Sequence, residues 1–165
     1  NRFTLLKNGN FALSEHPDSI GIKGWDASYN RITTWAILKE KRNGKELVFF
    51  NTHLDNDGKI ARKESARLIV QKIKEIAPHI PAILTGDFNC TPDETPLQVL
   101  EENVTYGPSW SFHDFGRLTK EECTLLDYIF TTDNIEVNRY RVIQDEPNNG
   151  FLSDHYPILV KLAFK

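Results

Sequence analysis

The chain has 165 residues, of which 39% are hydrophobic and 26% are charged, so it is long enough to bury a core and predicts one soluble globular domain. Its formal net charge of −3 gives no general attraction for nucleic acid, and no apolar run approaches the roughly 20 residues of a membrane span. The two cysteines, Cys90 and Cys123, can form at most one bridge and match no zinc or redox motif. Composition therefore excludes a membrane-spanning chain and a basic nucleic-acid-binding arm.

The first third of the chain predicts a strand, a loop and a hairpin. Residues 2–7 can form a strand, and residues 8–30 are rich in Gly, Pro, Ser and Asp, which predicts an irregular loop. Two apolar, β-branched runs at 32–41 and 45–52 flank an Asn-Gly pair at 43–44. This pair supplies the positive φ angles of a tight turn, so we expect a β-hairpin.

The rest of the chain predicts one long helix among further strands. Apolar and small residues at four-residue spacing predict an amphipathic helix over 59–77, with Asp57 as N-cap and Pro78 beyond its end. A second, short helix is expected at 95–102. Strands are expected at 81–85, 125–131, 135–143 and 156–163. The order of strands and helices predicts a layered α/β fold with a site along one sheet edge.

Four short segments place polar residues where an apolar strand ends or runs, at 51–55, 86–89, 126–130 and 153–155. The strongest placement is Asp127, because a carboxylate inside an apolar strand is costly unless it is paired, hydrogen-bonded or near a metal. Four such placements predict one shared site.

Each placement also has a structural explanation when it is taken alone. Asp87 and Asn89 can form a plain Asx-turn after a buried strand. A histidine at a strand end, such as His53, is more often a hydrogen-bonded structural residue than a catalyst. The segment 153–155 can be a polar loop that leads into the last strand.

Together, and in this order, the segments resemble the endonuclease/exonuclease/phosphatase superfamily, and in particular a bacterial subgroup of it. The likeness extends over almost the whole chain. It rests on Leu13-Ser14-Glu15-His16-Pro17-Asp18, Gly24-Trp25-Asp26-Ala27, Arg31-Ile32-Thr33-Thr34-Trp35, Thr52-His53-Leu54-Asp55, Ala61-Arg62-Lys63-Glu64-Ser65-Ala66, Gly86-Asp87-Phe88-Asn89, Phe112-His113, Asp127-Tyr128-Ile129-Phe130 and Ser153-Asp154-His155.

The resemblance implies a metal-dependent hydrolase of phosphoester bonds, which is a phosphodiesterase, a nuclease or a phosphatase. Asp127 would hold His155, which acts as base toward an attacking water or stabilises the phosphate. Asp87 would position or deprotonate the water, while Asn89 and His53 would donate hydrogen bonds to phosphate oxygens.

The resemblance also implies a cofactor and a fold. Asp154, with Asp87, would bind magnesium, or manganese as an alternative, because hard cations prefer oxygen ligands. Arg31 either contacts the phosphate or forms a structural salt bridge. The fold would be part of a layered α/β sandwich with a mixed, mainly antiparallel sheet. A nucleic-acid substrate enters only through this resemblance, since the charge does not favour it.

The chain departs from the family pattern at its start. Members usually begin with a strand that carries an asparagine, followed by a Gln-Glu motif whose glutamate is the principal metal ligand. This sequence contains no Gln-Glu pair and no methionine. We therefore expect residues 1–165 to be the C-terminal portion of such an enzyme, with a sheet face exposed for self-association. Any signal peptide would lie upstream, which leaves the compartment open.

Two other functions fit the residues. Without the metal-binding glutamate, the chain can be a catalytically incomplete fragment or a noncatalytic module that binds phosphate-bearing ligands. A zinc hydrolase can be built from His53, His113 and His155 with an aspartate, although the sequence lacks close His-x-x-x-His spacing.

Overall fold

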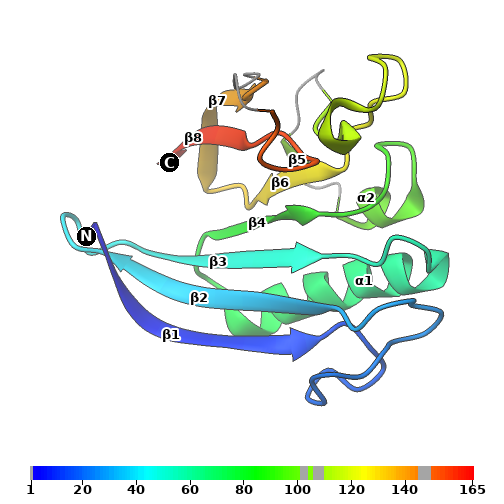
Figure 1. Cartoon of the computed structure of the whole chain (residues 1–165). Coiled ribbons are helices and arrows are strands. Elements are labelled where there is room, and N and C mark those ends of the chain that lie inside the picture. The colour runs from blue at the N-terminus through cyan, green and yellow to red at the C-terminus, as the bar shows by residue number, and fades with distance from the viewer. Residues whose placement is uncertain (1, 101–103, 106–109, 145–149) are drawn as a thin grey trace.

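The computed structural model describes residues 2–100, 104–105, 110–144 and 150–165. Along the chain, three strands precede the long helix, shorter helices and strands follow it, and three strands end the chain (Figure 1). They are β1 (Phe3–Ala12), β2 (Ile32–Glu40), β3 (Glu46–His53), α1 (Lys59–Ile76), β4 (Ala82–Asp87), α2 (Thr95–Leu100), β5 (Val104–Thr105), η2 (Asp114–Gly116), β6 (Asp127–Thr131), β7 (Ile135–Val142) and β8 (Ile158–Phe164).

The strands form a six-stranded sheet with the order β1-β2-β3-β4-β6-β5 and a two-stranded sheet of β7 and β8. Within the larger sheet, β3 and β4 are parallel and are connected through α1, while the other described pairs are antiparallel. The expected α/β fold with a mixed, mainly antiparallel sheet is confirmed.

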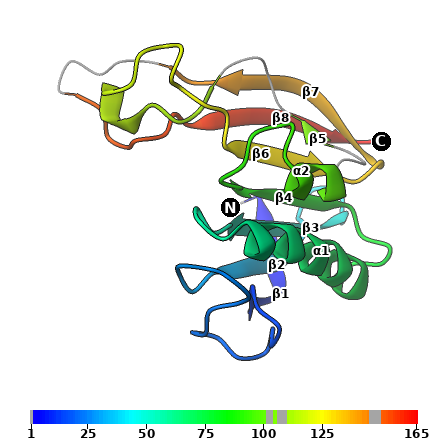
Figure 2. The same ribbon diagram turned by 90° about the vertical axis from the view of Figure 1, so that its right-hand side faces the viewer.

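The two faces of the larger sheet carry separate cores. On one face, α1 and α2 pack against buried residues such as Phe50 and Leu84. On the other face, Leu47 and Ile83 pack with β7 and β8, which lie beside β6 in both views (Figures 1 and 2). This gives the layered arrangement of helix, sheet and partial second sheet.

The second sheet covers only part of that face. Phe49 alternates with the buried Val48 and Phe50, so it points away from α1, and its side chain is 37% exposed. Ile32 is similarly 38% exposed. Self-association through these apolar residues stays a prediction. No helix in the described part of the chain is long and apolar enough to cross a membrane, and both cysteines are free thiols.

The N-terminal half corrects two expectations. β1 continues to Ala12 instead of ending at residue 7, because residues 8–12 pair with β2 from Ala36 to Ile32. In the hairpin, Gly44 has a φ of +72°, whereas Asn43 is not among the described residues with positive φ. The Asn43 carboxamide instead accepts the N–H of Lys45, so the connection is longer than a two-residue turn.

The start of α1 also differs from expectation. The N-cap is Gly58 and not Asp57. Glycine has no side chain that could cap the helix. The carboxylate of Asp26, from the loop after β1, accepts the N–H groups of Ile60 and Ala61 at 3.2 and 2.6 Å. A distant residue therefore satisfies the donors that a local cap would.

Other boundaries shift by a few residues. β4 continues through Asp87, and β6 begins at Asp127, two residues later than expected. β7 ends at Val142 and β8 begins at Ile158. α2 is described as far as Leu100, so the last two residues of the expected helix lie outside the described residues.

Candidate active site

Three of the expected site residues form a row across neighbouring strand ends. His53 at the end of β3 pairs with Asp87 at the end of β4, and Asp87 pairs with Asp127 at the start of β6. Because paired residues share a face of the sheet, the three side chains lie together. We call His53, Asp87 and Asp127 the strand-end row.

The residue before Asp87 must be a glycine for this row to form. A Cβ atom on Gly86 would clash with the backbone oxygen of Thr52, on the neighbouring strand. Only glycine allows the two backbones to approach this closely, directly beside His53 and Asp87.

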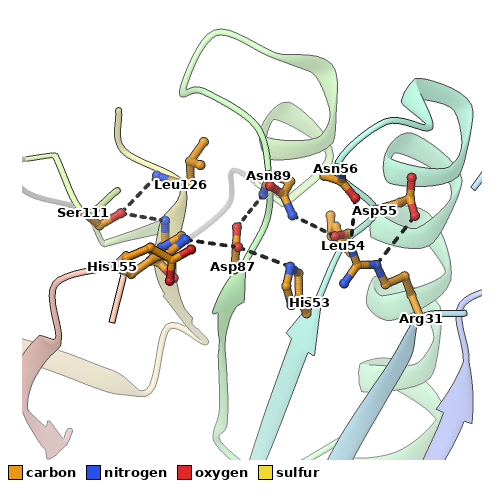
Figure 3. A network of polar contacts seen from close by, with 12 residues as sticks. Arg31, His53, Leu54, Asp55, Asn56, Asp87, Asn89, Ser111, Leu126 and His155 are labelled. Atoms are coloured by element: carbon orange, nitrogen blue, oxygen red, sulfur yellow. Dashed lines mark hydrogen bonds and ion pairs between the residues drawn. The ribbon is translucent and has the colours of Figure 1, made fainter. Parts of the chain in front are cut away.

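His155 reaches the row from a different part of the chain. It belongs to the turn formed by residues 153–155, which we call the histidine turn. Its Nδ1 lies 2.6 Å from Asp127 Oδ2, and its Nε2 lies 3.7 Å from Asp87 Oδ2. His53 Nε2 lies 3.3 Å from the same Asp87 oxygen, so Asp87 stands between two histidines (Figure 3).

Asn89 joins this group through an Asx-turn. It has a φ of +47°, and its N–H donates to Asp87 Oδ1 at 2.9 Å. Its side-chain amide donates to the carbonyl oxygen of Leu54 at 3.0 Å. The turn that explains Asn89 structurally is thus also what places it beside Asp87.

Burial and neighbouring charges shift the pKa values of Asp87, His155 and His53 in different directions. Burial raises the pKa of Asp87, the charge of Asp127 adds to this, and the Asn89 N–H offsets it only in part. For His155, burial acts to lower the pKa, but the hydrogen bond and charge of Asp127 outweigh it, so the pKa is raised. Burial and the charge of Arg31 lower the pKa of His53 against the pull of Asp87. The His53 side chain is 55% exposed, so the effect of burial is modest there.

Arg31 makes the contacts of a structural salt bridge. Its Nε lies 3.6 Å from Asp55 Oδ2, and its Nη2 donates to Asn56 Oδ1 at 3.1 Å (Figure 3). Asp55 itself accepts backbone N–H groups from two loops, those of Ser28 and Tyr29 before β2 and those of Asp57 and Gly58 before α1. Despite its burial, these bonds hold the pKa of Asp55 well below its usual range.

The described residues do not assemble a metal centre by themselves. Among them, no three His, Cys, Asp or Glu side chains are grouped to hold an ion. Asp154 Oδ1 accepts a bond from the Ser153 hydroxyl at 3.3 Å, and the Asp87 carboxylate is engaged by the two histidines and Asn89. The donor set that is present therefore does not fit a magnesium ion without further ligands.

The zinc arrangement finds no ligand group either. His113 is 2% exposed and packs between the rings of Phe151 and Tyr156, at centroid distances of 4.5 and 4.0 Å. Its Nδ1 accepts the N–H of Gly116 at 3.0 Å. A buried ring with its Nδ1 so engaged does not join His53 and His155 in a metal site.

Ser111 is a site residue that sequence reasoning missed. It is fully buried, and its hydroxyl accepts the N–H groups of Leu126 and Asp127, both at 3.2 Å (Figure 3). Its neighbour Phe112 packs on the His155 ring with centroids 5.0 Å apart. A single serine outside any apolar run carries no signal by which the sequence alone could have identified it.

The row borders a cavity of about 480 Å³ between the larger sheet and the start of β8. His53, Asp87 and Asp127 line one side of it, and Tyr156 and Ile158 line the other. The site thus offers one carboxylate between two histidines, a second carboxylate that orients one of them, and open space beside the row. Such a set can exchange protons with a bound water and donate hydrogen bonds to an anion.

Comparison with known proteins identifies the family of the chain. The sequence model of the Endonuclease/Exonuclease/phosphatase family matches residues 13–155. The structure of the endonuclease/exonuclease/phosphatase from Bacteroides vulgatus is 39% identical with a TM-score of 0.93, and the match covers 99% of this chain and 67% of that one. A mannosyl-6-phosphatase of Bacteroides thetaiotaomicron is 36% identical with a TM-score of 0.86, over 99% of this chain and 68% of the other.

Among curated proteins, Nocturnin of Drosophila melanogaster is 24% identical, in a match that covers 68% of this chain and 23% of that protein. The chain thus spans about two thirds of the solved relatives' chains and under a quarter of the curated relative. The family match covers most of the sequence and includes all four polar segments. The fold is shared with the Bacteroides vulgatus structure over nearly the whole chain. The chain belongs to the endonuclease/exonuclease/phosphatase family of phosphoester hydrolases.

Proposed function

We propose that this chain carries the acid–base centre of a phosphoester hydrolase. The observation that supports this most is the 2.6 Å contact between His155 and Asp127, with the Asp87 carboxylate 3.7 Å from the other nitrogen of the same imidazole. An oriented histidine beside a carboxylate of raised pKa is the pairing that proton transfer to and from water requires.

Asp87 and His155 have different roles in the proposed reaction. Asp87 takes a proton from the attacking water, because its raised pKa makes it a stronger base than an ordinary carboxylate. His155, whose pKa is raised by Asp127, places positive charge near the phosphate when it is protonated, as negative charge develops there.

His53 and Asn89 act as hydrogen-bond donors to the phosphate oxygens. The lowered pKa of His53 keeps its ring neutral near pH 7, which leaves one ring N–H as a donor. The Asn89 amide uses one N–H on Leu54, and an amide NH₂ group has a second. Arg31, fixed by Asp55 and Asn56, adds a positive charge at the same end of the site.

Magnesium, or manganese, is the cofactor that we propose, with Asp154 and Asp87 as protein ligands. The family is typically magnesium-dependent. Magnesium retains several waters and needs few carboxylates, but the described residues supply no third ligand. When bound, the ion would neutralise phosphate charge.

The substrate that we propose is a phosphate monoester, with a sugar phosphate as the first compound to test. The support is the 36% identity to a mannosyl-6-phosphatase over 99% of this chain. A nucleic-acid substrate is less favoured, because the chain has a formal net charge of −3.

A second candidate is a noncatalytic module that binds phosphate-bearing ligands. It is favoured by one observation, that the described residues gather no group of three metal ligands. In that case the row and Arg31 would bind a phosphate without hydrolysing its ester.

The test is hydrolysis of p-nitrophenyl phosphate, bis-p-nitrophenyl phosphate and mannose 6-phosphate, with and without Mg²⁺. We expect metal-dependent turnover of the monoesters that the His155→Ala variant loses. Folded protein that binds inorganic phosphate but turns over none of the three compounds would refute the hydrolase and support the binding module.

A further inference from the structure

The two partners of the histidine–aspartate pair are not fixed to each other by the sheets. Asp127 begins β6, whereas His155 precedes β8, and 28 positions of sequence separate them. In the described part of the chain, no strand pairing joins β6 to the histidine turn. Their 2.6 Å contact therefore depends on something else to hold the two backbones in place.

Residues 111–113 supply contacts to the aspartate side of the pair. The hydroxyl of Ser111 accepts the N–H groups of Leu126 and Asp127, each at 3.2 Å. Ser111 is 0% exposed, so water does not compete for these two donors. One side chain thus fixes the backbone at the start of β6, where the carboxylate is attached.

The same segment contacts the backbone on both sides of His155. The carbonyl oxygen of Ser111 accepts the N–H of Tyr156 at 2.7 Å, and the N–H of His113 donates to the carbonyl oxygen of Asp154 at 3.0 Å. The residues before and after His155 are therefore both tied to residues 111–113.

Phe112 lies between these two bonds and touches the imidazole itself. It forms an isolated antiparallel bridge with His155, and the two rings are 5.0 Å apart at 57°. The ring of Phe112 packs against the imidazole at this tilt, which limits the rotation of the imidazole about its Cα–Cβ bond.

The segment is itself well anchored. The N–H groups of Ser111 and Phe112 both donate to the carbonyl oxygen of Thr124 at 2.9 Å. The His113 ring is buried between Phe151 and Tyr156. Because residues 111–113 are held by these contacts, they can keep Asp127 and His155 at a fixed separation.

We propose that Ser111 and Phe112 are positioning residues of this site: Ser111 holds Asp127 and the histidine turn at a fixed separation, and Phe112 fixes the rotation of the His155 ring. The consequence for catalysis rests on the proposed function, whereas the effect on the geometry of the pair does not. Displacing a catalytic group by about 1 Å can reduce a rate by about 100-fold.

The test compares Ser111→Ala with Thr132→Ala. The hydroxyl of Thr132 accepts the N–H of Ala82 at 2.9 Å, and Ala82 lies at the end of β4 opposite to the site. Thr132→Ala therefore removes a similar hydroxyl–backbone bond far from the site. The first measurement is the low-field proton signal of the His155 Nδ1–H, assigned by its absence in His155→Ala. The second is kcat and KM on p-nitrophenyl phosphate.

We expect folded Ser111→Ala to lose or broaden the low-field signal and kcat to fall about 10- to 100-fold with little change in KM. Thr132→Ala should lower the melting temperature and leave the signal and kcat unchanged. A folded Ser111→Ala with the wild-type signal, or a wild-type protein without the signal, would overturn the proposal.

Phe112→Ala keeps the proposal testable if Ser111→Ala does not fold, because it truncates a ring and leaves the backbone bonds of Ser111 and His113 in place. We expect the signal to broaden and kcat to fall about tenfold, as for a mispositioned catalytic group. An unchanged signal in this variant would overturn the role of the segment. Wild-type protein with the signal but no turnover would refute the hydrolase alone.

Discussion

The two histidines of the site are held in opposite ways. His53 belongs to the strand-end row, whose position follows from the pairing of β3 with β4. His155 belongs to the histidine turn, which lies outside the strands and is held by hydrogen bonds from residues 111–113 and by Asp127. Backbone pairing fixes the first region, and side-chain and loop contacts fix the second.

This difference separates what is robust in the site from what is adjustable. A strand-end residue moves only if the sheet moves, so damage to the row should cost stability. A turn held by a few bonds can shift while the fold stays intact, so damage there should cost activity. The predictions below test this division.

The largest expected effect is the loss of activity in His155→Ala. Removing an oriented acid–base group should lower kcat by about 100- to 10,000-fold. The melting temperature should fall only modestly, because the residue lies in a turn, although its side chain is only 22% exposed and the variant leaves Asp127 without this partner. Steady-state kinetics and thermal unfolding measure the two effects.

The matched control for this variant is His79→Ala. His79 is exposed and lies in the connection between α1 and β4, at the end of the sheet away from the site. His79→Ala should alter neither kcat nor the melting temperature. If His155→Ala unfolds the protein, the turn is part of the structural core and the division between the two regions is wrong.

Gly86→Ala should break the strand-end row from within. The added Cβ would clash with the Thr52 backbone oxygen, so the two strands must separate. We expect a loss of about 3 kcal/mol in the free energy of unfolding, measured by urea denaturation. Activity should fall further than the fraction of folded protein, because the separation also moves His53 and Asp87 relative to each other.

Gly44→Ala separates this effect from that of a positive φ alone. Gly44 has a φ of +72°, but the nearest atom to its added Cβ is 3.9 Å away. A loss of about 1 kcal/mol is expected from the backbone conformation. Equal losses in the two variants would show that the close approach of β3 and β4 at Gly86 has no special importance.

The two histidines should titrate on opposite sides of the ordinary histidine pKa, which is about 6.5. The pKa of His53 is lowered by burial and Arg31, and that of His155 is raised because Asp127 outweighs burial. NMR titration of the ring protons without metal measures both. Asp127→Asn should lower the pKa of His155, and an unchanged value would contradict the assigned cause.

The same shifts fix the sign of their contributions to stability. The contribution of His155 is fully present below about pH 6.5 and is lost as the pH rises through its raised folded pKa. The pH dependence is reversed for His53, because the folded state favours the neutral ring. Its contribution to stability is present above about pH 6.5 and is lost as the pH falls through its lowered folded pKa.

Sequence reasoning identified the row because its signals are local. Asp127 is conspicuous in an apolar strand, and its partner His155 explains how the structure satisfies a carboxylate there. His53 and Asp87 each end an apolar run, and strand ends of a parallel pair meet at one sheet edge.

The parts that sequence reasoning missed depend on contacts between distant residues. Asn8, Gly9 and Asn10 have little strand propensity, but pairing with β2 makes them part of a strand. Asp26 caps α1 from about 35 residues away, so no local capping rule identifies it. Ser111 acts on Leu126 and Asp127 across 15 and 16 positions of sequence, which no motif records.

The smallest expected effect concerns the metal, whose proposed ligands come from both regions: Asp87 from the row and Asp154 from the histidine turn. Because the described residues gather no third ligand, we expect Mg²⁺ to bind this chain weakly and Asp154→Asn to weaken it several-fold further, since ligand charge sets affinity. Isothermal titration calorimetry with Mg²⁺ measures this without activity. Asp133→Asn, an exposed carboxylate beyond the end of β6, is the control and should bind as the wild type does. Equal weakening in both variants would mean that Mg²⁺ responds only to overall charge, and the metal would then not link the row to the turn.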